Sequence, residues 1–344
     1  RFRKLRSMSS PPPRFVVAGY IPDYRMDAID LGSVGANLSH ALLFSVSPFA
    51  NGSISFSALP PIRMMALGRA RREQTHLRAL VSVGGGGRSA HFGALSADPK
   101  SRGRFARLLS SYCERNKLHG ADLDWEAPST SAEAANYEAL LRRVRKEFVG
   151  RTPALELTMA MHTGGHARLL QRAAEHVDRV HLMAYDMPDA RQRHSTEEAA
   201  EKAVAEAIAE GIPREKLVLG IPFYGRDTAN LASAAAYRDL RRTRTHGTDE
   251  NFVGSIYFNG PATVRRKTAF AARAGLAGVM IWEVGQDDDS YASGGAPLPP
   301  EIAEVANIAS TADWRAGEQM DEASASRFLL AVEGKSTLAD RDEL

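Results

Sequence analysis

Asp122, Asp124 and Glu126 occupy alternate positions in the chain, with Leu123 and Trp125 between them. Alternation is the period of a β-strand, so the three acids are predicted to project from one face and the apolar residues from the other. Like charges that share a desolvated face destabilise one another, and the arrangement is best explained if one acid holds a proton near neutral pH. A protonated carboxyl beside ionised ones is what general acid catalysis requires.

Short apolar runs alternate with helical patterns along most of the chain. We predict strands at Phe15–Tyr20, His40–Ser45, Leu80–Gly84, Ala121–Trp125, Leu155–Met161, Val180–Tyr185, Leu217–Ile221 and Gly278–Trp282. Several of these runs are almost wholly apolar, as is typical of parallel strands covered on both faces. The clearest helical patterns between them are Lys100–Asn116, Ser131–Phe148 with Ser131 as its cap, and Glu197–Glu210.

Repeated strand-then-helix units predict an α/β fold, specifically a (β/α)8 TIM barrel. The alternative is a doubly wound open sheet, which should carry a glycine-rich phosphate-binding turn after its first strand, and Gly19–Pro22 is not such a turn. We divide the chain into a basic, proline-rich leader (residues 1–14), a catalytic barrel domain (15–309) and a charged tail (310–344) in which Ser326–Val332 has a helical pattern.

The composition is that of a soluble globular protein, with 44% hydrophobic and 25% charged residues among 344. Lys and Arg (44) barely outnumber Asp and Glu (41), and the basic residues are scattered, so we expect no nucleic-acid partner. No apolar run is long enough to span a membrane. The single cysteine, Cys113, lies in a helical pattern as a core residue. No His or Cys cluster has metal-ligand spacing, so we predict no metal ion. We also predict no cofactor and a monomer.

In a (β/α)8 barrel the active residues lie at the carboxyl ends of the strands. This rule selects Tyr20, Phe44, Gly84, Gly85, Asp122, Asp124, Glu126, Met183, Tyr185, Asp186, Tyr224 and Trp282. Carboxylates move protons, and flat rings pack on the apolar C–H faces of pyranoses. A phosphate ligand would instead favour a basic, glycine-rich helix start. The set therefore indicates a sugar ligand.

Five segments of the chain, in the right order, resemble the motifs of family 18 glycoside hydrolases, the chitinases and their relatives. These segments are His119–Glu126, which is similar to the family signature D-G-x-D-x-D-W-E, then Val81–Gly85, Met183–Asp186, Lys216–Arg226 and Gly278–Glu283. The resemblance extends over most of the chain. It implies a TIM barrel that hydrolyses β-1,4-linked N-acetylglucosamine polymers, chitin or chitooligosaccharides.

The resemblance also implies a role for each residue. Glu126 would protonate the leaving oxygen, with its pKa raised by the negative field of Asp124 and Asp122. The substrate's own N-acetyl oxygen would be the nucleophile. Asp124 would orient the acetamido N–H and share a proton with Asp122, and Tyr185 would hydrogen-bond the acetamido group. Contacts with the sugar are implied for Trp282, Met183, Asp186, Tyr224, Phe44, Tyr20, Gly84, Gly85 and Arg226.

The chain departs from the family pattern in two places. His119 stands where the signature has its first Asp, and we expect it to shift the pH optimum. The segment between Arg226 and Gly278 is short, whereas many chitinases carry an insertion domain there. We therefore predict a barrel without that domain, and a more open groove that favours cutting within a polymer.

Two other functions stay open. One is an endo-β-N-acetylglucosaminidase that acts on N-linked glycans or peptidoglycan, and the other is a non-catalytic chitinase-like lectin on the same barrel. Lectin relatives typically lose the terminal Glu of the signature, which is present here as Glu126. The last four residues, Arg341–Leu344, resemble an endoplasmic-reticulum retrieval signal and predict a secreted or lumenal protein.

Overall fold

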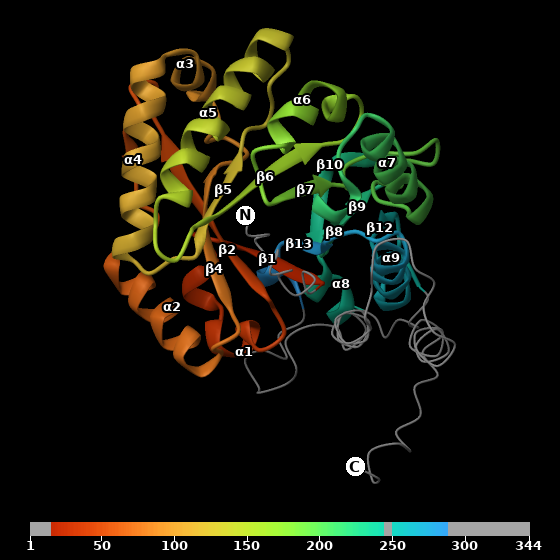
Figure 1. Ribbon diagram of the computed structural model, residues 1–344. Helices are drawn as coiled ribbons and strands as arrows, with labels where there is room; N and C mark the ends of the chain where they lie inside the picture. The colour runs from red at the N-terminus through yellow and green to blue at the C-terminus, as the bar shows by residue number, and fades with distance from the viewer. Residues whose placement is uncertain (1–14, 244–249, 288–344) are drawn as a thin grey trace, which may run out of the picture.

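The computed structural model describes residues 15–243 and 250–287. Eight parallel strands run in the order β1, β13, β8, β7, β6, β5, β4, β2, and β2 pairs with β1 to close a barrel (Figure 1). These strands are β1 (Val16–Pro22), β2 (His40–Pro48), β4 (Arg78–Gly84), β5 (Gly120–Asp124), β6 (Glu156–His162), β7 (Arg179–Met183), β8 (Leu217–Pro222) and β13 (Gly278–Trp282). Each overlaps one predicted strand, so the TIM-barrel prediction is confirmed.

Helices follow the strands and cover the outside of the barrel (Figure 1). They are α1 (Leu31–Gly35), α2 (Pro61–Glu73), α3 (Phe92–Ala97), α4 (Pro99–Arg115), α5 (Ser131–Val149), α6 (His166–Ala174), α7 (Glu197–Ala209) and α9 (Pro261–Arg273). None of the described helices is long and apolar enough to cross a bilayer. The predicted leader, the tail with Ser326–Val332, and the barrel domain beyond Asp287 lie outside the described residues.

Helix α5 begins at Ser131, as predicted, but its N-cap is Thr130 and not Ser131. The Thr130 hydroxyl accepts a hydrogen bond from the amide of Glu133 at 3.1 Å. The Glu133 carboxylate in turn accepts from the amide of Thr130 at 3.3 Å. This reciprocal capping box satisfies two amides that the first turn leaves free, and it fixes the start of the helix that follows β5.

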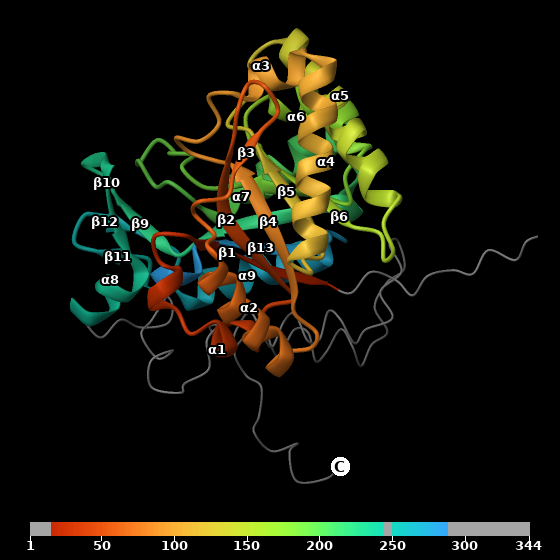
Figure 2. The same cartoon turned by 90° about the vertical axis from the view of Figure 1, so that its left-hand side faces the viewer.

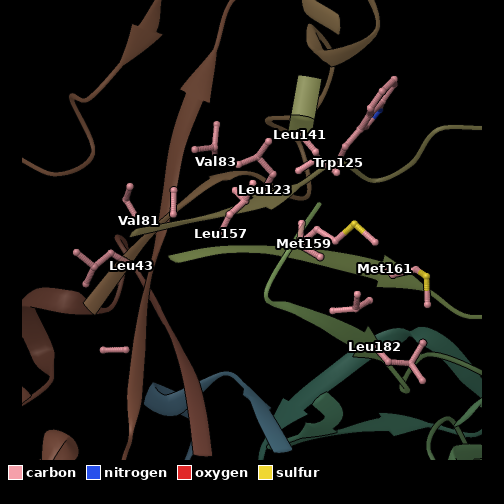
Figure 3. Packing of buried hydrophobic residues seen from close by; sticks show 14 of the residues in the cluster. Leu43, Val81, Val83, Leu123, Trp125, Leu141, Leu157, Met159, Met161 and Leu182 are labelled. Carbon is pink, nitrogen blue, oxygen red and sulfur yellow. The ribbon is translucent and has the colours of Figure 1, made fainter. Parts of the chain in front are cut away.

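Alternate residues of each strand pack in two different hydrophobic layers. Leu123 and Trp125 point outward, where Leu123 and Leu141 of α5 belong to the same buried cluster (Figure 3). Tyr20 and Phe44 point inward and belong to a second cluster inside the barrel. Because β5 alternates in the same way, Asp122 and Asp124 take inward positions. The predicted register of the acids is therefore confirmed for both strand residues.

The chain forms a small antiparallel sheet between β8 and α9. It contains β9 (Tyr224–Asp227), β10 (Asn230–Ala236), β11 (Phe252–Val253) and β12 (Ile256–Tyr257), and α8 (Tyr237–Thr243) follows β10. Figure 2 shows it standing at one side of the barrel. The sequence analysis expected no insertion domain here and did not anticipate this sheet, because two of its strands have only two residues each. The two buried hydrophobic clusters of the described residues contain side chains of the barrel and its helices and none from β9 to β12. We therefore describe the small sheet as an extension of the barrel.

A two-residue strand, β3 (Ile54–Ser55), pairs antiparallel with the last residues of β2, where β2 continues past the closed barrel. Cys113 is buried in α4, where its thiol donates to the carbonyl of Gly120 at 3.3 Å. It is a core residue, as predicted.

Candidate active site

A cleft of about 710 Å³ opens where the barrel strands end. The predicted residues that line it are Tyr20, Phe44, Asp124, Glu126, Met183, Tyr185, Asp186, Tyr224, Arg226 and Trp282. They are separated by up to 262 positions in the chain (282 − 20), and the closed barrel brings them together. Asp122, Gly84 and Gly85, which were predicted with them, do not line this cleft.

Asp122 is completely buried behind the cleft, two residues before Asp124 in β5. Its carboxylate accepts hydrogen bonds from the hydroxyls of Tyr20 at 2.8 Å, Thr158 at 2.6 Å and Ser82 at 3.2 Å. The Nδ1 atom of His181 lies 3.4 Å from Oδ1 of Asp122, the oxygen that also accepts from Thr158. Burial alone would raise the pKa of Asp122, but His181 and the hydroxyl donors outweigh it and lower that pKa. Asp122 is therefore held as a carboxylate.

Asp124 is the last residue of β5, and its environment is the opposite. It is 2% exposed, and its Oδ1 atom is buried with no hydrogen-bond partner among the described residues. Burial raises the pKa of Asp124 well above its usual range, and the nearby charges of Glu126 and Asp122 raise it further. Asp124 therefore binds a proton more readily than Asp122, and its Oδ1 atom is free for a ligand.

Glu126 lies two residues beyond the end of β5, at the mouth of the cleft. Its side chain is 28% exposed, and its amide donates to the Ser89 hydroxyl at 3.3 Å. Burial raises the pKa of Glu126, and a hydrogen bond from the amide of Gly86 opposes that shift. The raised pKa agrees with the predicted direction, and burial is its largest cause.

Three aromatic side chains support one another under the cleft. The ring of Trp282 meets those of Phe44 at 4.8 Å and Tyr20 at 5.4 Å, both edge to face. Phe44 and Tyr20 are buried, whereas Trp282 is partly exposed in the cleft lining. Met183 also lines the cleft and is 7% exposed. The indole of Trp282 is thus presented as a flat apolar surface that its neighbours hold in place.

A charged group borders the cleft on the side of the small sheet. Asp186 binds Arg226 of β9 through two hydrogen bonds of 2.7 and 2.6 Å. Burial would raise the pKa of Asp186, but His194, at 3.3 Å, and Arg226 lower it well below its usual range. Arg226 and Ala234 bring the small sheet into the cleft lining. The small sheet therefore forms part of the wall on that side of the groove.

Gly84 and Gly85 let the end of β4 approach the acids closely. Both have positive φ, +96° and +84°. A Cβ on Gly84 would lie 2.3 Å from the Asp124 carbonyl oxygen, and one on Gly85 would lie 2.2 Å from the Phe44 ring. The amide of Gly85 donates to the Asp124 carbonyl at 2.7 Å. We therefore assign these glycines to positioning Asp124 and Phe44 and not to contact with a ligand, and Gly86 reaches the cleft instead.

The sequence analysis missed several lining residues, namely Tyr24, Gly86, His162, Thr163, His166, Met187, Ala234 and Gln286. Four of them, Tyr24, Gly86, Thr163 and Met187, lie in loops beyond a strand end, where the strand rule gives no residue. His162 is different, because it is the last residue of β6. The strand rule would have found it if it had been applied to the end of the fifth predicted strand.

His119 lies at the other end of β5 from the cleft. Its ring accepts a hydrogen bond from the amide of Ala79 at 2.9 Å and lies 3.3 Å from Arg71 of α2. Burial and the neighbouring Arg71 lower the pKa of His119 to about 4. The imidazole is thus neutral at neutral pH, whereas the Asp of the family signature would be negatively charged there, and the effect of His119 on the pH optimum stays a prediction.

Among the described residues, no group of three or more His, Cys, Asp or Glu side chains could hold a metal ion. The side chains of the cleft offer a carboxyl with a raised pKa, a second carboxyl at the mouth, tyrosine hydroxyls and an apolar floor.

Known proteins resemble the chain over most of its length. Residues 16–287 match the family model for glycosyl hydrolases family 18. The chain is 25% identical over 319 residues to "Probable chitinase 2" of Drosophila melanogaster, and the match covers 74% of this chain. It spans 64% of that relative's length, which is less than two thirds.

Two solved structures have a similar fold. One is the GH18 chitinase ChiB of Flavobacterium johnsoniae, with a TM-score of 0.71, 25% identity, and coverage of 85% of this chain and 93% of that one. The other is the GH18 chitinase of Cycas revoluta in complex with (GlcNAc)3, with a TM-score of 0.70, 22% identity, and coverage of 84% of this chain and 98% of that one.

Proposed function

This chain belongs to glycosyl hydrolases family 18, and from that premise we propose that it hydrolyses β-1,4-linked N-acetylglucosamine polymers with retention of configuration. The name of the Drosophila relative and the (GlcNAc)3 complex of the Cycas enzyme support this class of substrate. One observation carries the proposal. Glu126 and Asp124 line the same cleft, and Asp124 has a buried oxygen without a partner among the described residues.

In the first step, Glu126 donates its proton to the glycosidic oxygen while the bond to C1 breaks. The acetamido oxygen of the same sugar attacks C1 and forms a cyclic oxazolinium ion, so the nucleophile belongs to the substrate. Asp124 accepts the acetamido N–H on its free Oδ1 atom, and its developing negative charge stabilises the cation. Tyr185 donates a hydrogen bond to the acetamido group. The leaving sugar departs with the proton from Glu126.

In the second step, water attacks C1 while the ionised Glu126 takes a proton from it, and the product keeps its original configuration. The proton on Asp124 must move as the cation forms. Asp122 is the neighbouring acid of β5, and three hydroxyl donors and His181 stabilise its charge. We retain the prediction that Asp122 shares a proton with Asp124 and moves it between the two steps.

The remaining lining residues bind the sugar. Trp282 supplies the floor under the pyranose at the cleavage point, and Phe44 and Tyr20 hold that indole in place. Met183 contributes an apolar wall. The charged pair of Asp186 and Arg226, together with the Tyr224 hydroxyl, offers donors and acceptors for sugar hydroxyls.

A defined N-acetylglucosamine hexamer tests this proposal. We expect the protein to cleave it, and NMR of the fresh products should show the β-anomer at the new reducing end before mutarotation. Initial products with the α-configuration would contradict the substrate-assisted mechanism. The distribution of product lengths would separate cleavage within the chain from cleavage at its ends.

A high-mannose glycopeptide and a peptidoglycan fragment separate the alternatives. Release of the glycan from the glycopeptide with no cleavage of the hexamer would assign an endo-β-N-acetylglucosaminidase. Binding of the hexamer with no cleavage of any of these substrates would assign a lectin. The retrieval signal predicted at Arg341–Leu344 lies outside the described residues, and a secreted or lumenal location remains a proposal.

A further inference from the structure

A histidine faces the proposed acid at the mouth of the cleft. His162, the last residue of β6, places its Nε2 atom 3.9 Å from Oε2 of Glu126. Both residues line the cleft, and both side chains are partly exposed, at 42% and 28%. The pair is thus close enough for charge on one ring to act on the other group, while ligand and solvent can still reach it. None of the five sequence motifs includes this residue.

Three titratable or charged groups face His162. Glu126 approaches it from the loop after β5, and His166 of α6 lies beside it with the two rings 5.6 Å apart. Asp186, in the loop after β7, contributes a weaker attraction and is itself paired with Arg226. The Nδ1 atom of His166 lies 3.0 Å from the Thr163 carbonyl, so it carries the hydrogen and donates. Burial and the neighbouring His166 lower the pKa of His162, which keeps its ring mostly neutral near neutral pH.

We propose that His162 is a positioning residue for Glu126: its neutral ring lets the acid keep its proton, and its protonated ring, 3.9 Å away, draws that proton off. The proposal rests on the proposed function, in which Glu126 must be protonated to start the reaction. It adds a residue from a different strand to the control of that proton. His166 acts one step further out, because its charge opposes the protonation of His162.

The sign of the effect follows from the charges. A cation beside a carboxyl stabilises the ionised form and lowers its pKa. Two unit charges 4 Å apart interact by about 1 kcal/mol in water, which corresponds to somewhat less than one pKa unit. A permanent cation at position 162 should therefore lower the pKa of Glu126, and a neutral ring that cannot be protonated should leave it high or raise it.

Two variants at this position give opposite predictions. His162→Phe keeps a ring that cannot be protonated, and the alkaline limb of the kcat/KM profile on a fluorogenic chitooligosaccharide should move up by less than about half a pH unit, because only a minor fraction of the wild-type rings is charged there. His162→Lys fixes a full cation there, and the limb should move down by about half a pH unit. His166→Phe is the matched control on the neighbouring ring. It relieves the repulsion that keeps His162 neutral, so it should give a smaller shift in the same direction as Lys.

NMR of the Glu126 side-chain carboxyl, labelled with ¹³C, reads the same pKa without relying on turnover. We expect the Phe and Lys variants to bracket the wild type in this titration as well. Shifts in the same direction, or none, in folded variants would overturn the proposal, since loss of packing alone cannot give opposite signs. If the wild type failed to cleave any substrate, the proposed function would fail, yet the carboxyl titration would still decide whether His162 controls Glu126.

Discussion

A buried carboxylic acid lies at each end of the barrel, in two adjacent strands, and the two acids have opposite surroundings. Glu156 begins β6 at the amino end and is 7% exposed. It pairs with Arg179, with Arg78 at 3.0 Å, and with the ring of His40 at 3.3 Å. Asp124 ends β5 at the carboxyl end, where its neighbours are other acids and one of its oxygens has no partner among the described residues.

The difference shows what each end of the barrel does. At the amino end, Glu156 meets two guanidinium groups, and burial lowers the pKa of Arg179 only to about 10, so the cluster stays charged and compensated. Such pairing ties β2, β4, β6 and β7 together and leaves no group free to react. At the carboxyl end, the polar groups are incompletely paired. That arrangement costs stability, and it is characteristic of a site whose partner is a ligand.

The largest expected effect is on catalysis at the carboxyl end. Glu126→Gln removes the transferable proton while keeping the size of the side chain. We expect kcat on a fluorogenic chitooligosaccharide to fall by about 10²–10⁴-fold. Thermal unfolding should change little, because Glu126 is partly exposed and its side chain makes no close ion pair. Activity equal to that of the wild type would remove Glu126 from the mechanism.

Asp124→Asn should separate activity from stability. We expect activity to fall by about 10²–10³-fold, as when one electrostatic stabiliser of a transition state is lost. Because the folded pKa of Asp124 is raised, its contribution to stability is fully present below its usual pKa and is lost as the pH rises through the folded value. The variant should therefore melt at a higher temperature than the wild type at neutral pH, by about 2 °C for each kcal/mol gained.

The same measurement across pH tests the cause. The difference in Tm between Asp124→Asn and the wild type should shrink as the pH falls and should vanish below about 4, where the wild-type carboxyl becomes protonated in both states. A variant that is less stable than the wild type at neutral pH would mean that the ionised carboxylate has stabilising partners in the folded protein. The contrast between the two ends of the barrel would then fail.

Glu156→Gln tests the amino end in the same way. Removing one partner of a buried ion pair leaves uncompensated charge, and we expect the free energy of unfolding in urea to fall by about 3 kcal/mol. This is at the low end for buried pairs, since Arg78 is 41% exposed and can be rehydrated. At temperatures where the variant is folded, kcat/KM should stay at the wild-type value. A loss of activity without a loss of stability would show that this end also serves the site.

The sequence could predict the positions of the acids along β5 because they depend on a local rule. Alternation fixed which face Asp122 and Asp124 share, and the outward Leu123 and Trp125 hold that register. The contacts that decide where the proton lies could not be predicted in this way. Tyr20 is 102 residues from Asp122, and which of its hydroxyl neighbours reaches the carboxylate depends on how the strands close into a barrel.

Some contacts at the rim of the cleft also escaped prediction. Arg226 was found through its motif, but its two hydrogen bonds to Asp186 depend on a sheet whose shortest strands have no period to detect. His162 has no acidic or aromatic neighbour in the sequence that would mark it. Only the geometry brings its ring beside Glu126.

The smallest expected effect concerns the hydrogen bonds that keep Asp122 ionised. Tyr20→Phe removes the hydroxyl that donates to Asp122 at 2.8 Å, and a hydrogen bond to a charged group contributes about 1.5–3 kcal/mol. We expect a loss near the lower figure, because Thr158 and Ser82 still donate. Since the pKa of Asp122 is depressed in the folded state, its stabilisation is present above its usual pKa and is lost as the pH falls through the folded value.

The stability difference between Tyr20→Phe and the wild type should therefore be full at neutral pH and shrink below about pH 4. Tyr137→Phe is the matched control, because Tyr137 is also fully buried but its hydroxyl donates to the carbonyl of Leu123 at 2.9 Å. Its loss should cost the same amount at every pH, since a carbonyl does not titrate. Urea unfolding of both variants between pH 3 and pH 7 makes the comparison. If the two costs depended on pH in the same way, the Tyr20 hydroxyl would not be acting on the charge of Asp122, and the lowered pKa of that acid would need another source.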